Sequence, residues 1–81
     1  VAGTTEIKAE KTDLCEYIKY LCNKAAPYAE KLDIRILCKT PKNTIIVNIE
    51  REDFSYAFFD ILRNAMEHSP AKSKIKVTLQ K

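Results

Sequence analysis

Glycine is almost absent from this 81-residue sequence, and its single copy is Gly3 near the start of the chain. Loops that cradle phosphate groups use backbone N–H groups, and they need glycine because a side chain would block the approach. A glycine-rich phosphate loop is therefore excluded within these 81 residues.

The cysteines are few and odd in number: Cys15, Cys22 and Cys38. An odd count argues against a disulfide framework, and the spacing fits no zinc-binding pattern. Cys15 and Cys22 are seven residues apart, which is two turns along one face of a helix. We interpret all three as small buried hydrophobic residues in a reducing cytoplasm, with a metal or redox role as the minor alternative.

Long apolar runs are missing as well. None approaches the roughly 20 residues that span a bilayer, and no signal-peptide pattern is present. The net charge is only +3, and basic and acidic residues are interleaved until the last ten positions. Nucleic-acid-binding domains usually carry a stronger, clustered basic excess. We therefore expect a cytoplasmic chain without a nucleic-acid partner, and leave open whether its parent protein is anchored in the cell membrane.

Apolar residues make up 46% of the chain and recur with clear periodicity, so a packed core is expected. Residues 4–9 are short and permit a strand. Asp13 then predicts a helix N-cap, with Glu16 completing a capping box. The helix should end near Lys31, and its buried face repeats at helical spacing: Leu14, Ile18, Leu21, Cys22, Ala25 and Ala29.

The second half of the chain reads as two strands, a helix and a last strand. Residues 33–39 and 44–49 are rich in branched residues, and the turn residues 40–43 between them predict a β-hairpin. A helix follows over about 51–68. Residues 73–80 alternate strictly between apolar and polar, which indicates a half-buried strand. The predicted order is β-α-β-β-α-β, an α/β (α+β) two-layer sandwich.

The segment most informative about chemistry is 58–70, Phe-Phe-Asp-Ile-Leu-Arg-Asn-Ala-Met-Glu-His-Ser-Pro. On a helix, Asp60, Asn64 and Glu67 or His68 would share one face, a turn apart. The intervening apolar residues should turn toward the core: Ile61, Leu62 and Ala65. A polar stripe beside an apolar one, near a helix end, can hold a small charged ligand against a packed sheet.

Residues 60–70 resemble the N-box of the histidine kinase ATPase domain, one branch of the GHKL ATPases. Members typically show an apolar helix leading to Asn-Leu-Leu-x-Asn-Ala-x-Lys-Tyr-Ser/Thr at this point. The flanking order agrees, with a late Pro-Tyr-Ala segment at 27–29 in the first helix and a Lys-Ile-Lys-Val-Thr-Leu strand at 74–79. From Asp13 onward the chain is similar to the front half of this ATP-binding (Bergerat) fold, which it would contain incompletely.

The resemblance implies roles for four residues. Asn64 matches the magnesium-binding asparagine, whose side-chain oxygen ligates the ion that bridges the ATP phosphates. Asp60 matches an upstream polar position, which is Asn or His in many histidine kinases and a water-activating glutamate in gyrase-like ATPases, so it is the catalytic candidate. Glu67 stands where a basic residue often meets the phosphates, and His68 replaces a tyrosine at the edge of the nucleotide pocket.

Each of these residues also has a purely structural interpretation. Asn64 could be an ordinary surface residue, and Asp60 and Glu67 could be solvated carboxylates on a helix face. His68 could be a favourable partner of the helix dipole without touching a ligand. The sequence leaves these alternatives open.

The resemblance further implies ATP and Mg²⁺ as cofactors of the complete domain, and a response regulator and a dimerisation and phosphoacceptor domain as partners. The parent would be a protein-histidine kinase of a two-component signalling system. Within this chain the only histidine is His68, inside the N-box, so no phosphoacceptor is present. We expect residues 1–81 to form one partial ATPase domain without a second domain. It should be inactive alone, bind Mg-ATP weakly or not at all, and self-associate through an exposed edge.

Two other readings remain. One is an anti-sigma-factor serine kinase or a degenerate GHKL phosphotransferase within the same superfamily. The other is a ferredoxin-like module for protein interaction, because that fold shares the β-α-β-β-α-β order. RNA recognition on such a fold stacks bases on aromatic residues of the central strands, and the predicted strands 4–9 and 44–49 contain none.

Overall fold

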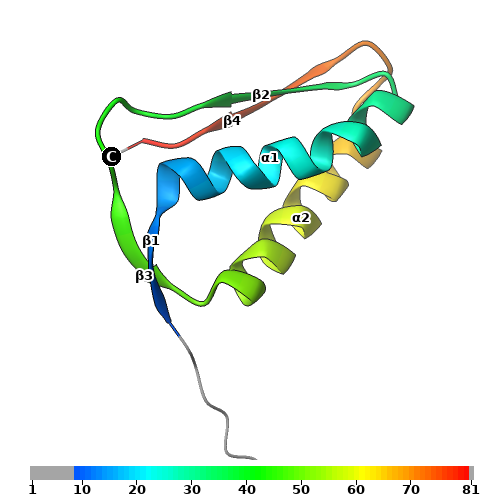
Figure 1. Cartoon of the computed structure of the whole chain (residues 1–81). Helices are drawn as coiled ribbons and strands as arrows, with labels where there is room; N and C mark the ends of the chain where they lie inside the picture. Colours follow the sequence, from blue (N-terminus) through cyan, green and yellow to red (C-terminus); the bar gives the residue numbers. More distant parts are fainter. Residues whose placement is uncertain (1–8, 81) are drawn as a thin grey trace, which may run out of the picture.

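The computed structural model describes residues 9–80. Its elements follow the predicted β-α-β-β-α-β order (Figure 1): β1 (Glu10–Asp13), α1 (Leu14–Lys31), β2 (Arg35–Lys39), β3 (Ile46–Ile49), α2 (Arg51–Glu67) and β4 (Lys74–Thr78). The strand predicted over 4–9 lies outside the described residues apart from Ala9, which belongs to no strand. The first observed strand instead occupies positions just before the helix.

Helix α1 begins where the sequence predicts. The Asp13 Oδ1 atom accepts hydrogen bonds from the backbone N–H groups of Cys15 (3.1 Å) and Glu16 (3.4 Å). The Glu16 carboxylate lies 3.7 Å from the Lys19 ammonium. Among the described residues no hydrogen bond joins it to the Asp13 N–H, so only half of the predicted capping box forms. The helix includes Pro27 and ends at Lys31, where its end was predicted.

The strand pairing differs from the prediction. β2 pairs in parallel with β4, whereas β3 pairs antiparallel with β1, in two separate two-stranded sheets. The predicted hairpin between β2 and β3 is therefore wrong. Parallel pairing lets Ile36 and Cys38 of β2 share a helix-facing side with Ile75 and Val77 of β4, and α2 supplies the crossover that such a pair needs.

The core lies between the β2–β4 pair and the two helices, which form the second layer of the sandwich (Figure 1). Its buried residues are Ala25, Ala29, Ile34, Leu62 and Met66, and its half-buried partners are Ile36, Phe58, Phe59, Ile75 and Val77. The alternation predicted for the last strand is confirmed, because its lysines are exposed while Ile75 and Val77 are half-buried. The α/β two-layer prediction is thus confirmed.

The cysteines fit the core interpretation. All three are free, with Cys15 and Cys22 buried and Cys38 half-buried. No helix among residues 9–80 combines the length and the apolar character that a membrane crossing requires.

The start of α2 is tied to the small β1–β3 sheet by one side chain. Arg51 donates from Nε to Thr12 Oγ1 (2.9 Å) and from Nη2 to the Lys11 carbonyl (3.3 Å), and its Nη1 lies 3.2 Å from Glu10 Oε2. Glu50 caps the same helix by accepting hydrogen bonds from two backbone N–H groups of the first turn. These contacts fix the direction in which α2 leaves the sheet, and hence the orientation of its outer face.

Candidate functional site on the outer face of helix α2

The four residues singled out from the sequence lie at the C-terminal end of α2, and all four are exposed. Asp60, Asn64 and Glu67 follow one another at intervals of four and three residues, so they share one helix face. His68 directly follows as the C-cap residue. The opposite face is held in the core by the buried side chains of Leu62 and Met66.

Asp60 is engaged by a neighbour that the sequence analysis did not single out. Its Oδ1 atom lies 3.0 Å from Arg63 Nη2, one helical turn later, and both side chains are largely exposed. The i, i+3 spacing of opposite charges was the signal that could have revealed this pair. An exposed pair of this kind contributes only about 0–1 kcal/mol, so a ligand could compete for the carboxylate.

The Asn64 amide is open to solvent. Among residues 9–80 no hydrogen bond engages its side chain, while its backbone carbonyl accepts from the His68 N–H (3.3 Å). An amide oxygen is a hard ligand, and two carboxylates one turn away on either side favour a cation. No group of three or more His, Cys, Asp or Glu residues suited to a metal occurs in the described part of the chain.

This donor set fits Mg²⁺ bound together with a nucleotide. Magnesium commonly takes one or two protein oxygens and completes its shell with water and substrate phosphates, rather than relying on an all-protein cage. Asn64 would supply the direct protein oxygen.

His68 ends the helix. Its backbone N–H donates to the Asn64 carbonyl (3.3 Å), and the next residue, Ser69, donates from its backbone N–H to the Met66 carbonyl (3.2 Å) and from Oγ to the Ala65 carbonyl (2.7 Å). The last turn is thereby closed by local hydrogen bonds. The exposed His68 side chain is left beside Glu67, at the edge of the polar stripe.

One residue of this face was predicted wrongly. Ile61 was predicted to turn toward the core, but its side chain is 71% exposed. Successive helical residues are about 100° apart, so Ile61 falls beside Asn64 rather than with the buried Leu62 and Met66. The exposed face of α2 therefore carries one apolar side chain, that of Ile61, next to the Asn64 amide.

A groove of about 730 Å³ lies between α1 and α2 and is lined by residues of both helices. Asp60 and Glu67 line it together with three cationic side chains, those of Lys24, Lys31 and Arg63. Asn64 and His68 do not line it. The structure thus places all four candidates on one helix end but does not gather them around a single cavity.

Comparison with known proteins bears on this arrangement. No protein-family model and no curated protein sequence matches the chain. Solved structures do match: the cytoplasmic segment of histidine kinase QseC superposes with a TM-score of 0.83 at 19% identity, over 89% of this chain and 48% of that one. The catalytic domain of histidine kinase ThkA gives a TM-score of 0.76 at 21% identity, over 86% of this chain and 48% of that one.

This chain has the fold of a histidine kinase catalytic domain. It spans about half the length of the two solved chains. The predicted partial ATPase fold is therefore confirmed. The ferredoxin-like topology, which has a single four-stranded sheet, is excluded by the two separate two-stranded sheets. At these identities the match concerns the fold, and the roles of individual residues stay predictions.

Proposed function

We propose that the chain is part of the ATP-binding, catalytic domain of a protein-histidine kinase and supplies its magnesium-binding N-box. The observation that carries the proposal is the open amide of Asn64, flanked by Asp60 and Glu67 on the outer face of α2, in a fold shared with histidine kinase catalytic domains. A Mg²⁺ ion held there would neutralise charge on the transferring phosphoryl group.

Each residue of the candidate site would have its own role near the phosphates of the nucleotide. Asn64 would ligate the ion through its amide oxygen. Asp60 would orient a water next to the ion, with Arg63 holding the carboxylate in place. Glu67 would repel bare phosphate and tolerate it only with the metal, since like charges repel at short range. Ile61 and His68 would border the ligand on its less polar side.

The parent protein is part of the same proposal. The phosphoryl group would pass from ATP to a histidine on a neighbouring dimerisation domain, and from there to an aspartate of a response regulator. On this proposal the site would belong to the cytoplasmic part of a two-component signalling protein. The lone glycine of the 81 residues implies that other segments of the parent complete the nucleotide site.

The test is a calorimetric titration of Mg-ATP into the 81-residue chain and into a form extended by about 70–80 residues, which reaches an ordinary domain size. We expect binding by the extended form and weak or undetectable binding by the chain alone. Tight binding by a monomeric 81-residue chain would contradict the proposal.

A second candidate is a degenerate domain of the same superfamily that no longer binds nucleotide. It is favoured by the acid at Glu67, where phosphate would need a cation, and by the ion pair that already occupies Asp60. Absence of binding by both forms in the same titration would select it.

A further inference from the structure

The solvent face of the β2–β4 pair carries cations and no acid. Three outward positions of β2 and three of β4 make up this cationic sheet face: Arg35, Leu37, Lys39, Lys74, Lys76 and Thr78. All six side chains are exposed. Four of them are cationic, on a chain whose net charge is only +3.

The register brings like charges together. Arg35 lies opposite Lys74, and Lys76 lies opposite Leu37. Like charges that face each other across a strand pair destabilise the sheet. In the described part of the chain, ion pairs form at Glu16–Lys19, Glu10–Arg51 and Asp60–Arg63, and none includes a residue of the cationic sheet face. Its repulsion is therefore not relieved within residues 9–80.

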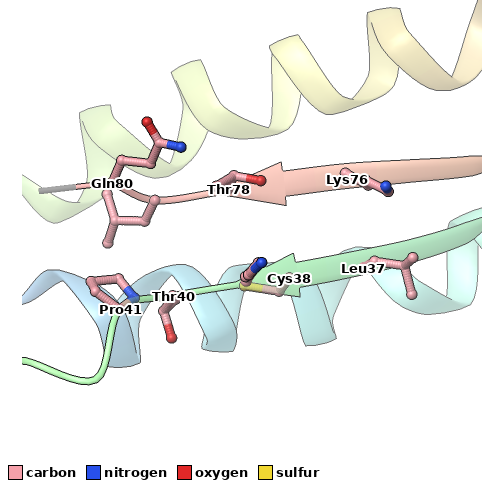
Figure 2. A pocket seen from close by; sticks show the side chains of 9 residues that line it. Leu37, Cys38, Thr40, Pro41, Lys76, Thr78 and Gln80 are labelled. Atoms are coloured by element: carbon pink, nitrogen blue, oxygen red, sulfur yellow. The ribbon is translucent and has the colours of Figure 1, made fainter.

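A groove of about 640 Å³ opens at the C-terminal end of the same strand pair. Figure 2 shows Leu37 on β2 and Lys76 and Thr78 on β4, with Gln80 just beyond the end of β4 and the helices behind the strands. Lys39 and Pro41 also line this groove. Apolar contact from Leu37 and Pro41 is thus combined with two ammonium groups and with hydroxyl and amide hydrogen-bonding groups.

We propose that the cationic sheet face and this groove dock an acidic, extended segment of a partner protein. An apolar side chain of the segment would contact Leu37, and its carboxylates would reach Lys39 and Lys76. Charge complementarity of this kind sets partner choice and accelerates association. The inference does not depend on nucleotide binding, because the groove contains none of the residues at the end of α2.

Other polyanions fit the face less well. Binding of single-stranded nucleic acid uses aromatic side chains as stacking platforms, and the cationic sheet face has none. A membrane-surface site needs apolar or aromatic residues that enter the headgroup layer. Here Leu37 is the only exposed large apolar residue of the face, while exposed tyrosines lie on the helices, at Tyr20, Tyr28 and Tyr56.

Fluorescence anisotropy of the 81-residue chain tests the docking surface. The probe is a fluorescein-labelled peptide of glutamates and aspartates around one central leucine. The double substitution Lys39→Glu/Lys76→Glu is expected to weaken binding about tenfold, which corresponds to about 1.4 kcal/mol, because two exposed charge contacts are lost. The control Lys11→Glu/Lys19→Glu makes the same change in net charge away from the groove, and should change affinity less than about twofold.

Two further measurements separate docking from general charge attraction. Leu37→Ala in the chain and leucine to serine in the peptide should each weaken binding several-fold. If the attraction were purely electrostatic, neither change would alter the affinity. The milder variant Lys39→Gln/Lys76→Gln, with its fold checked by circular dichroism, should fall between the wild type and the double glutamate variant.

Equal losses in the groove and control variants would overturn the proposal. So would binding of vesicles of phosphatidylcholine with about a quarter phosphatidylserine in preference to the peptide, since such vesicles report anionic-lipid attraction.

Discussion

The Nε atom of Arg51 donates a 2.9 Å hydrogen bond to Thr12 Oγ1 and so joins the first turn of α2 to β1. Thr12 is the buried polar residue of the described core, at 4% exposure, and its hydroxyl in turn donates to the Glu10 carbonyl (3.1 Å). The pair connects residues 39 positions apart in the chain. It orients the helix that carries the candidate site.

Removal of this connection should destabilise the fold. Arg51→Ala deletes hydrogen bonds to Thr12 and to the Lys11 carbonyl as well as the ion pair with Glu10. We expect a loss of about 1–3 kcal/mol in the free energy of unfolding, because the buried hydroxyl oxygen of Thr12 loses the N–H group that donates to it. Urea denaturation followed by circular dichroism measures it. The control Arg63→Ala, which breaks only an exposed pair, should cost less than about 1 kcal/mol. Equal effects would show that Arg51 is not a structural link.

The two faces of α2 should respond oppositely to truncation. Leu62 is 4% exposed in the core, whereas the adjacent Ile61 is 71% exposed. Leu62→Ala is expected to cost about 2–5 kcal/mol, which is enough to unfold a small domain, and Ile61→Ala to stay within about 0.5 kcal/mol. Thermal denaturation of the two variants is the measurement. A larger loss at Ile61 would mean that another segment already covers it in solution.

Stability at acidic pH should report on the cap of α2. Hydrogen bonds from backbone N–H groups, first that of Asp53 and also that of Glu52, hold the pKa of Glu50 below its usual value of 4.5. A carboxyl whose pKa is lowered on folding stabilises the fold above its unfolded pKa, and this contribution is lost as the pH falls through the folded value. The Glu50 carboxylate in turn raises the pKa of Asp53, which acts in the opposite direction.

Glu50→Gln should therefore be less stable than the wild type near neutral pH, and the difference should shrink as the pH falls below about 4.5. Urea denaturation between neutral and acidic pH measures the two curves. Parallel curves over the whole range would show that Glu50 does not cap the helix as a carboxylate.

Thiol chemistry tests the packing between α1 and β2. Burial raises the pKa of the Cys22 thiol to about 12, and a hydrogen bond with the Cys38 thiol adds to the shift. The reactive form of cysteine is the thiolate, so Cys22 should resist iodoacetamide at mildly alkaline pH. Half-buried Cys38 should be modified first. Mass spectrometry of the alkylated peptides gives the order, and faster labelling of Cys22 than of Cys38 would contradict this packing.

Much of this fold could be predicted from local sequence. The Asp13 cap, the apolar face of the first helix and the alternation of β4 each depend on neighbours within a few residues. Each was predicted correctly, except that Leu14 on the helix face is half-buried and Cys15 is buried instead. Strand pairing depends on partners far along the chain. The turn residues at 40–43 suggested a hairpin, but β2 gains a shared apolar face by pairing with β4 instead.

The site was predictable to the same degree. Helical spacing sufficed to place Asp60, Asn64 and Glu67 on one face, because a helix fixes directions locally. Spacing alone did not reveal that Ile61 faces solvent, because the width of the buried helix face depends on where α1 and the sheet pack against α2. The anchoring of α2 by Arg51 likewise depends on β1, a strand that the sequence pattern did not predict at these positions.

The central claim is that Asn64 holds the magnesium ion of Mg-ATP. Its most direct test is calorimetric titration of Mg-ATP into the extended form carrying Asn64→Ala, beside Asn23→Ala, a matched control at an exposed position of α1. We predict that Asn64→Ala abolishes binding while Asn23→Ala and the wild type bind equally, with unchanged circular dichroism in all three. Equal Mg-ATP affinity in the Asn64→Ala variant and the wild type would contradict the account.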